Sequence, residues 1–300
     1  MKYGSIDIGT NSVLLLILEK ESSFFKEILD ISEVPRLGEN LTSSGILKDE
    51  AILRTLLVLE KYNELLAREG VEKRFIFGTA VLREAKNRDV FLKRVKDKIG
   101  IEPEILSEKK EAFYSFLSVV MDEELEYKDE IILDLGGGST EVIYGKNKKM
   151  ERFFSFPFGV VKLKEVFFKT DPPDESMLIY AEKYLSGILK ERLKKEKKDL
   201  CGVGGTVTNL AGILTKKSYF DKKLIHGMTV SKKDVEELYD TMKRMTYKEI
   251  EENFPSLEKS RADVIFSGTL ALKCIMDFFE SEYLKVSTKG LRYGIIYERA

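Results

Sequence analysis

Two short stretches of the chain combine an acid, glycine and serine in a pattern suited to binding phosphate. Residues 7–12 (Asp-Ile-Gly-Thr-Asn-Ser) and 134–139 (Asp-Leu-Gly-Gly-Gly-Ser) lie 127 positions apart, and Gly78-Thr79 recurs as Gly205-Thr206 at the same offset. Glycine lets backbone N–H groups approach an anion closely. Two matches in one register indicate two related halves, each with a glycine turn after a buried strand. This pattern favours phosphoryl chemistry.

The donors expected to bind phosphate are backbone N–H groups of the glycine turns, together with nearby hydroxyl and amide side chains. Thr206 is expected near the start of a helix, where free N–H groups and the helix dipole favour an anion. The alternative is that the glycines only make tight turns between strands, and the repeat favours the phosphate interpretation. The substrate-binding candidates are Asn11, Ser12, Thr79, Gly136, Gly137, Gly138, Ser139, Gly204, Gly205 and Thr206.

Acidic residues beside the turns are candidate metal ligands. Asp7 and Asp134 end buried strands, and Glu141 follows Asp134 on the next strand. Hairpin pairing would bring Asp134 and Glu141 within reach of one hydrated ion, and oxygen ligands with retained waters suit Mg²⁺ or Mn²⁺. The alternative is that Asp7 and Asp134 only bond the turns. Arg83, four residues after Thr79, is a candidate to neutralise charge on a transferring phosphoryl group, or else a surface arginine.

The elements that must position these residues follow the same order twice, which predicts an α/β fold with two similar lobes. Each half opens with three strand-like runs and continues with alternating helices and strands. In the first half the ranges are 3–8, 12–19 and 24–32 for strands, 49–69 for a helix, 74–77 for a strand, 89–99 for a helix, 104–106 for a strand and 109–122 for a helix. In the second half they are 130–134, 141–145, 150–156, 200–203 and 283–286 for strands, and 160–168, 176–197, 206–214, 232–245, 261–279 and 292–298 for helices.

Composition gives no global signal for a nucleic-acid or membrane partner. The 300 residues contain 50 basic and 51 acidic side chains, and no apolar run approaches the length of a membrane span. We expect a cytoplasmic protein, with two reduced core thiols at Cys201 and Cys274 and no cysteine–histidine zinc site, because His226 is the only histidine. The lysine-rich run 190–198 is either a polyphosphate track or a solvated helix face.

The motifs taken together resemble the exopolyphosphatase/guanosine pentaphosphate phosphatase (Ppx/GppA) family. The matching segments run in order along nearly the whole chain, and 134–141 is the most specific of them. They are 7–12, 78–85, 134–141, 156–161 (Phe-Pro-Phe-Gly-Val-Val), 204–206, His226-Gly227, 261–263 (Arg-Ala-Asp) and 289–294 (Lys-Gly-Leu-Arg-Tyr-Gly). The resemblance implies a duplicated actin-like ATPase (ribonuclease H-like) fold, with an active site in the cleft between two lobes. It also implies metal-assisted hydrolysis of the terminal phosphate of inorganic polyphosphate or of pppGpp.

The resemblance assigns the catalytic glutamate to Glu111. In the family this residue is the second glutamate of a Ser-Gly-x-Glu-Glu-Ala stretch at the start of a helix, and here the stretch reads Ser-Glu-Lys-Lys-Glu-Ala at 107–112. Glu108 replaces the glycine and Lys110 replaces the first glutamate. We expect Glu111 to orient or deprotonate the attacking water and Arg83 to assist it. Without the resemblance, Glu111 would be an ordinary helix-surface acid.

The expected lobes are residues 1–124 and 125–300, with the last helix a candidate to pack back on the first lobe and no additional C-terminal helical domain. The expected activity is exopolyphosphatase. The alternatives are a pppGpp 5′-phosphohydrolase, a non-catalytic (p)ppGpp or polyphosphate sensor, and an ATP-hydrolysing or sugar-kinase-like member of the wider actin-like group. Whether the chain forms a homodimer is left open.

Overall fold

The computed structural model describes residues 1–22 and 24–300, and it divides into two compact units. Unit 1 contains residues 1–121 and 290–300, and unit 2 contains residues 122–289. The expected boundary lay after residue 124, whereas residues 122–124 belong to unit 2. Residues 290–300 belong to unit 1, the lobe on which the last helix was a candidate to pack.

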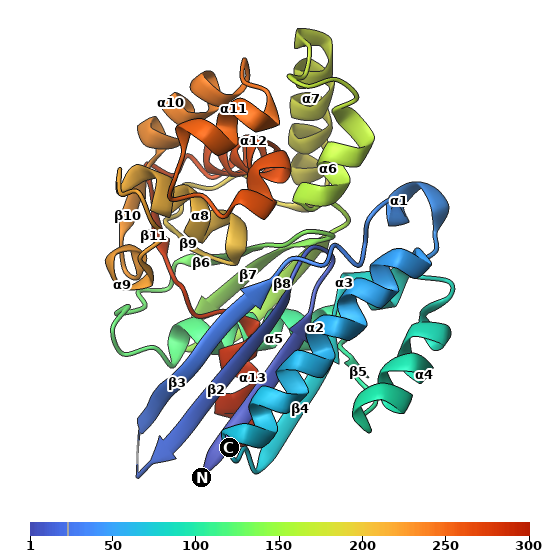
Figure 1. Ribbon diagram of the computed structural model, residues 1–300. Helices are drawn as coiled ribbons and strands as arrows, with labels where there is room; N and C mark the ends of the chain where they lie inside the picture. The colour runs from blue at the N-terminus through green and yellow to red at the C-terminus, as the bar shows by residue number, and fades with distance from the viewer. Residues whose placement is uncertain (23) are drawn as a thin grey trace. The chain divides into compact units, whose positions relative to one another are not determined.

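The sheet of unit 1 has five strands in the order β3-β2-β1-β4-β5 (Figure 1). The first three strands form an antiparallel meander, and β4 and β5 continue the sheet in parallel with β1. The strands are β1 (Lys2–Ile8), β2 (Val13–Glu21), β3 (Phe24–Glu33), β4 (Lys73–Gly78) and β5 (Glu104–Ile105). The helices are α1 (Leu41–Ser44), α2 (Asp49–Arg68), α3 (Ala80–Glu84), α4 (Arg88–Ile99), α5 (Glu108–Val120) and α13 (Leu291–Arg299).

Both faces of the unit 1 sheet are buried, because successive residues of a strand point to opposite faces. On β2, Leu15 and Ile17 pack in a core formed with α2 and α4, whereas Leu16 and Leu18 pack in a core formed with α5 and α13. Helix α2 begins with two acids and ends with Arg68, an arrangement that complements its dipole. The strand that follows the first glycine turn is therefore packed on both faces.

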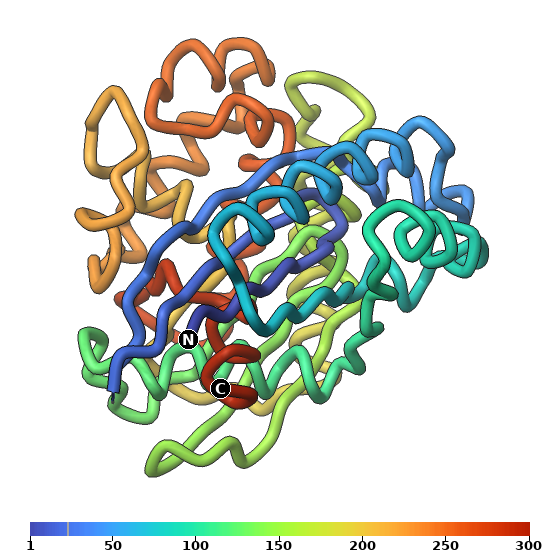
Figure 2. Tube along the Cα trace, turned by 60° about the horizontal axis from the view of Figure 1, so that its bottom comes forward, coloured from blue at the N-terminus to red at the C-terminus, as the bar shows by residue number. Residues whose placement is uncertain are grey.

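Helix α13 comes from the end of the chain and completes unit 1. It packs on α5, β1 and β2, and Figures 1 and 2 both show it against α5. Arg292 donates two hydrogen bonds to Asp30 of β3, at 2.9 and 2.8 Å. Burial opposes the charge of Arg292, but the Asp30 carboxylate outweighs this effect and raises the pKa of the guanidinium. Gly294 has no room for a side chain, since a Cβ there would lie 1.9 Å from the carbonyl oxygen of Tyr114.

Unit 2 repeats this strand order and adds one edge strand. Its six strands are ordered β10-β11-β9-β6-β7-β8, with β6, β7 and β8 antiparallel and β9 and β11 parallel to β6. The strands are β6 (Ile131–Leu135), β7 (Thr140–Lys146), β8 (Lys149–Phe156), β9 (Leu200–Val203), β10 (Thr229–Ser231) and β11 (Tyr283–Val286). The helices are α6 (Val160–Phe167), α7 (Glu175–Arg192), α8 (Gly205–Leu214), α9 (Lys222–Ile225), α10 (Lys232–Met242), α11 (Tyr247–Asn253) and α12 (Ala262–Phe278), the last preceded by a 3₁₀ turn (Lys259–Arg261).

The prediction that one helix continues to Lys197 is wrong, because α7 ends at Arg192 and Leu193 is extended, with φ −115° and ψ 151°. Lysine and glutamate favour helix intrinsically. However, residues 194–199 contain no apolar side chain that a further turn could bury. The lysine-rich run 190–198 is therefore only partly a helix face.

The two cysteines are buried and free, as the sequence predicted. Cys201 lies in β9 and Cys274 in α12, and burial raises the pKa of each thiol to about 12. These thiols are structural rather than reactive. Within the described part of the chain, no helix combines the length and the apolar character needed to cross a membrane.

Candidate functional site

The two glycine turns predicted from the sequence have the same backbone hydrogen bond. Gly9 N–H donates to the carbonyl of Ser12 at 2.9 Å, and Gly136 N–H donates to that of Ser139 at 3.1 Å. Each turn joins the first two antiparallel strands of its unit, β1 to β2 and β6 to β7. The repeat in the sequence thus corresponds to a repeated hairpin.

The carbonyl groups of the second turn are held by the start of α6. The N–H groups of Val160 and Val161 donate to the carbonyls of Gly136 and Gly137, both at 3.0 Å. Gly159 permits this contact, because a Cβ there would lie 2.4 Å from the carbonyl carbon of Gly137. The Phe-Pro-Phe-Gly-Val-Val segment therefore fixes the turn by its carbonyl side.

The N–H groups of this turn are left available. Those of Gly137, Gly138 and Ser139 donate to no residue that the structure describes. In unit 1, the Nδ2 group of Asn11 is buried and likewise has no hydrogen-bond partner among the described residues. Unbonded donors on a glycine turn form a concavity suited to an anion.

The turn after β9 lies beside the Asp134 carboxylate and requires glycine. Gly204 has φ +93°, and a Cβ there would lie 3.2 Å from Oδ1 of Asp134. Helix α8 begins at the next residue, and no side chain caps its N-terminus. Thr206 is 5% exposed and lies one residue inside α8, whereas Thr79 precedes α3. The shared offset of 127 therefore does not give the two threonines equivalent positions.

Arg261 is a site residue to which sequence reasoning assigned no role. A Cβ on Gly205 would lie 2.6 Å from its Nη1 atom, so the guanidinium covers the start of α8. Its Nε donates to Glu258 at 2.6 Å, and its side chain is 10% exposed. The only signal in the sequence was the Arg-Ala-Asp motif at 261–263, which gives no indication of a contact with a glycine turn 56 positions earlier.

Asp134 and Glu141 occupy directly opposed positions of the β6–β7 hairpin. Opposed residues of an antiparallel pair place their side chains on the same face of the sheet, with Cβ atoms about 4.5–5.5 Å apart. Glu141 is 1% exposed, and its Oε1 accepts a hydrogen bond from Ser155 at 2.9 Å. Two carboxylates beside a glycine turn form a donor set that fits Mg²⁺ or Mn²⁺.

The corresponding position in unit 1 has only one acid. Asp7 of β1 is opposite Leu14 of β2 and adjacent to Phe77 of β4. The hairpin of unit 1 therefore supplies a single carboxylate where that of unit 2 supplies two. Ser12 and Thr79, the hydroxyl candidates of this unit, are both buried.

Arg83 and Glu111 are in direct contact within unit 1. Nη1 of Arg83 lies 2.5 Å from Oε2 of Glu111 and also donates to the carbonyl of Leu106 at 2.9 Å. Glu111 lies in the first turn of α5, which Ser107 caps by accepting from Lys110 N–H. Glu111 is only 6% exposed, so it is not an ordinary acid on the helix surface.

A third acidic cluster lies at the start of unit 2. Ligand atoms of Asp122, Glu124 and His226 lie within 4.8 Å of one another, close enough to hold a metal ion. However, the Lys289 ammonium lies 2.7 Å from Oδ1 of Asp122. Nδ1 of His226 accepts from Thr288 N–H at 3.2 Å, so the neutral ring carries its proton on Nε2, which faces Asp122 at 3.1 Å. This arrangement suits an ion-paired network better than a metal.

Comparisons with known proteins agree with this fold. The model of the Ppx/GppA phosphatase family matches residues 16–300. The Aquifex aeolicus member of that family has a crystal structure with 33% identity and a TM-score of 0.84, covering 100% of this chain and 97% of the other. An exopolyphosphatase from Cytophaga hutchinsonii shares the fold at 24% identity, with a TM-score of 0.89 and coverage of 100% and 97%. The expected α/β fold, a duplicated actin-like ATPase fold, is confirmed.

Curated relatives include proteins with different names and lengths. The bifunctional 3-dehydroquinate synthase/phosphatase of Fusobacterium nucleatum is 35% identical over 98% of this chain, and the chain spans 46% of its length. Exopolyphosphatase 2 of Mycobacterium tuberculosis is 29% identical, over 91% of this chain and 89% of its own length. The guanosine-5′-triphosphate,3′-diphosphate pyrophosphatase of Photobacterium profundum is 28% identical, over 99% of this chain and 59% of its own length. The family match, the repeated glycine turns and the Asp134–Glu141 pair agree, and this chain belongs to the Ppx/GppA phosphatase family.

Proposed function

We propose that this protein hydrolyses phosphoanhydride bonds and releases the terminal phosphate of inorganic polyphosphate. The observation that carries the proposal is the turn at 137–139. Its three N–H groups are unbonded among the described residues, and it joins the two strands that carry the opposed Asp134 and Glu141. A terminal phosphate needs several hydrogen-bond donors and a compensating cation. This hairpin supplies the N–H donors and two carboxylates that would hold the cation.

In the proposed reaction, the oxygen of a water molecule bonds to the terminal phosphorus and the bridging P–O bond breaks. Glu111 orients the water and accepts its proton, and the shortened chain leaves as a phosphate anion. Arg83 holds the Glu111 carboxylate through Nη1. Its Nε and Nη2 atoms bond no side chain among the described residues, so they can stabilise charge on the transferring phosphoryl group.

Each unit supplies its own candidate groups for the phosphates and the metal. In unit 2, Gly136 to Ser139 and Gly204 to Thr206 would bind phosphate, and Asp134 and Glu141 would hold Mg²⁺ or Mn²⁺. In unit 1, the phosphate-binding candidates are Asn11, Ser12 and Thr79, and the candidate metal ligand is Asp7. A bound divalent ion neutralises charge on the phosphate oxygens. Arg261 would add a guanidinium at the start of α8.

The main alternative is release of the 5′-terminal phosphate of pppGpp. Relatives named guanosine-5′-triphosphate,3′-diphosphate pyrophosphatase support it, and the same phosphate groups would serve that reaction. A non-catalytic sensor is disfavoured because binding alone does not require the buried Arg83–Glu111 pair. Both proposed activities, on polyphosphate and on pppGpp, hydrolyse the bond to a terminal phosphate.

Phosphate release from polyphosphate, pppGpp and ATP, measured in parallel with the same preparation, tests the proposal. Polyphosphate should give the highest kcat/KM, with activity lost in chelator and restored by Mg²⁺ or Mn²⁺. A higher kcat/KM on pppGpp would replace polyphosphate by the alternative. Absence of phosphate release from all three, with binding retained, would make the protein a sensor.

A further inference from the structure

The first turn of α5, which carries Glu111, is held from two sides. Successive residues of a helix point about 100° apart, so Lys110 and Glu111 face different neighbours. Arg83 binds both the Glu111 carboxylate and the carbonyl of Leu106 through Nη1. On the other side, the Lys110 amine donates to Oε1 of Glu104 in β5 at 2.6 Å. A rotation of this turn would therefore break a contact on one side or the other.

Glu104 is also bound by α13, and this second contact closes a ring. Its Oε2 accepts from Nη2 of Arg299 at 2.9 Å, and the same Nη2 donates to the Tyr114 hydroxyl at 3.0 Å. Tyr114 lies four residues after Lys110, so both side chains are on the same face of α5. The ring of Lys110, Glu104, Arg299 and Tyr114 thus joins β5, α5 and α13. We call it the Glu104 network.

The charges of the Glu104 network are matched. Burial raises the pKa of Glu104, but hydrogen bonds from Lys110 and Arg299 outweigh it and lower the pKa of the carboxyl. Glu104 is therefore ionised at neutral pH between two cations. The Tyr114 hydroxyl donates to Glu298 at 2.9 Å, which adds the second acid beside Arg299. Each polar group that faces the network thus has a partner.

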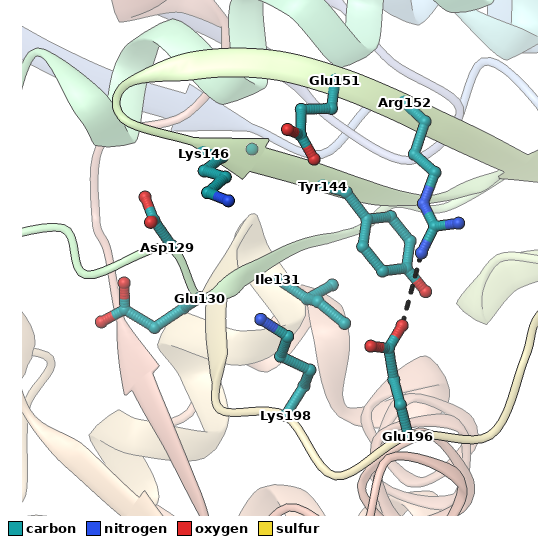
Figure 3. A pocket seen from close by; sticks show the side chains of 10 residues that line it. Asp129, Glu130, Ile131, Tyr144, Lys146, Glu151, Arg152, Glu196 and Lys198 are labelled. Carbon is teal, nitrogen blue, oxygen red and sulfur yellow. Dashed lines mark hydrogen bonds and ion pairs between the residues drawn. The ribbon is translucent and has the colours of Figure 1, made fainter.

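An ordinary ion pair of this protein is simpler. Figure 3 shows Arg152 and Glu196, which lie 3.4 Å apart at a pocket of unit 2, and Glu196 forms no other ion pair with a described residue. The Glu104 carboxylate is about as exposed as that of Glu196, at 35% against 33%, but two cations from two helices bind it. An exposed pair contributes little to stability, whereas several charges in a network hold their side chains in one geometry.

The place of the Glu104 network gives this geometry a use. The proposed hydrolysis requires the Glu111 carboxylate to lie at the attacking water, and a misplacement of about 1 Å can lower a rate about 10²-fold. Arg83 holds the carboxylate itself. The Glu104 network holds the helix that carries it, because Lys110 and Tyr114 tie α5 to β5 and α13. A catalytic group keeps its position only when such supporting contacts are fixed.

We infer that the Glu104 network positions Glu111 for catalysis, with Glu104 as its central positioning residue. This inference rests on the proposed function, because hydrolysis is what requires Glu111. Lys110 and Arg299 would act through Glu104, and the phosphate-binding candidates lie outside the network. Loss of the network should therefore lower kcat and leave KM nearly unchanged.

The first test compares Glu104→Ala with Glu196→Ala, which removes a carboxylate of similar exposure from an ordinary ion pair. On the substrate that wild-type protein hydrolyses fastest, Glu104→Ala should lower kcat about 10-fold and change KM less than about 2-fold. Glu104→Gln keeps an oxygen for both donors and should retain most of the activity. Glu196→Ala should resemble wild type. Equal kcat values for the two alanine variants, or a loss confined to KM, would overturn the inference.

The second test asks whether Lys110 acts through Glu104. Lys110→Met should lower kcat about 3-fold, and Lys110→Arg should restore it, because an arginine can still reach the carboxylate. Lys109→Met is the matched control, since Lys109 is exposed on the same turn and has no partner among the described residues. The double variant Lys110→Met/Glu104→Ala should be no slower than Glu104→Ala alone. Losses that multiply in the double variant would contradict a shared pathway.

Hydrogen exchange separates this inference from the proposed function. The Lys110 and Glu111 amides bond Ser107 in the first turn of α5, and Glu104→Ala should speed their exchange about 5-fold, whereas Glu196→Ala should not. If wild-type protein releases no phosphate from any substrate but shows this change, the proposed function fails and the support of Glu111 stands. If phosphate is released and Glu104→Ala speeds exchange without lowering kcat, the function stands and the network has only a structural role.

Discussion

Arg83 and Glu111 form a buried ion pair in which one guanidinium nitrogen bonds both the carboxylate, at 2.5 Å, and the carbonyl of Leu106. The side chains are 19% and 8% exposed. Two residues assigned to catalysis for different reasons are therefore one structural pair. The function of either residue must be tested with this coupling in view.

Glu111→Gln should lower kcat about 10²- to 10⁴-fold, because a positioned acid–base group contributes on this scale. KM should change little, since the phosphate-binding turns do not involve this residue. Glu108→Gln is the matched control on the same helix, because Glu108 is exposed. Steady-state phosphate release is the measurement. Near-normal turnover by Glu111→Gln together with an inactive Glu108→Gln would move the catalytic role by one turn of α5.

Arg83→Ala should lower kcat/KM by a factor corresponding to about 2.7–4 kcal/mol, the cost of losing one preorganised donor. Arg83→Lys should retain part of the activity, because an amine keeps the charge but cannot grip two oxygens in parallel. Arg83→Ala should also lower the melting temperature, since Glu111 then stays buried without its partner. Arg94→Ala, which breaks an exposed pair with Asp49, serves as the control. An Arg83→Ala protein that melts early but turns over normally when folded would give this arginine a purely structural role.

Asp134→Asn and Glu141→Gln should each raise the Mg²⁺ concentration needed for half-maximal activity, or abolish turnover. Removing one of two opposed carboxylates leaves a weaker oxygen site. Ser155→Ala should have a smaller effect in the same direction, because Ser155 only orients Glu141. Asp240→Asn, at an exposed position of α10, is the control. Unchanged metal requirement in both acid variants would place the metal elsewhere.

Asp122→Asn should destabilise the protein at neutral pH by about 1.5–3 kcal/mol, the range for hydrogen bonds to charged groups. Burial alone would raise the pKa of Asp122, but hydrogen bonds from His226 and Lys289 outweigh it and lower the pKa below its usual 3.8. A lowered pKa in the folded protein gives stability that is complete above the unfolded value and is lost as pH falls through the folded value. The gap between wild type and Asp122→Asn should therefore close below pH 3.8. Urea unfolding as a function of pH measures it, with the exposed Glu124→Gln as control.

Gly204→Ala should cost about 1–2 kcal/mol of stability, because φ +93° is strained for any residue with a Cβ. It should also reduce activity, since the added carbon would lie 3.2 Å from the Asp134 carboxylate. Gly187→Ala is an informative contrast. A Cβ at this position of α7 meets nothing within 4 Å, so it should stabilise the protein by about 0.5–1 kcal/mol. Thermal unfolding that ranks the two variants in the opposite order would contradict the assigned backbone geometry.

Local patterns predicted the features that depend on neighbouring residues. The hairpin that opposes Asp134 and Glu141 follows from strand alternation and a short glycine turn, so its register was readable from the sequence. The end of α7 was not readable, because the lysine-rich run has helical propensity and only the lack of apolar surface ends the helix. After Arg192 the local propensity favours a helix, whereas the lack of apolar side chains to bury favours its end.

Contacts between residues that lie far apart in the chain could not be predicted from the sequence. Nothing in the neighbourhood of Arg261 indicates that its guanidinium covers Gly205, and nothing near Glu111 indicates Arg83 as its partner. The family resemblance supplied the catalytic assignment of Glu111, but not the ion pair that explains its burial. Such contacts depend on how elements pack, which no short motif encodes.

Unit 2 is continuous in the chain, whereas unit 1 is completed by residues 290–300. A ribosome makes the chain from its N-terminus, and domains generally fold as units during synthesis. All of unit 2 is therefore available before unit 1 has its last helix. Until then the surface of α5 around Tyr114 has no α13 to cover it, and Asp30 has no Arg292 to pair with. The first segment to be translated is thus the last to reach its final packing.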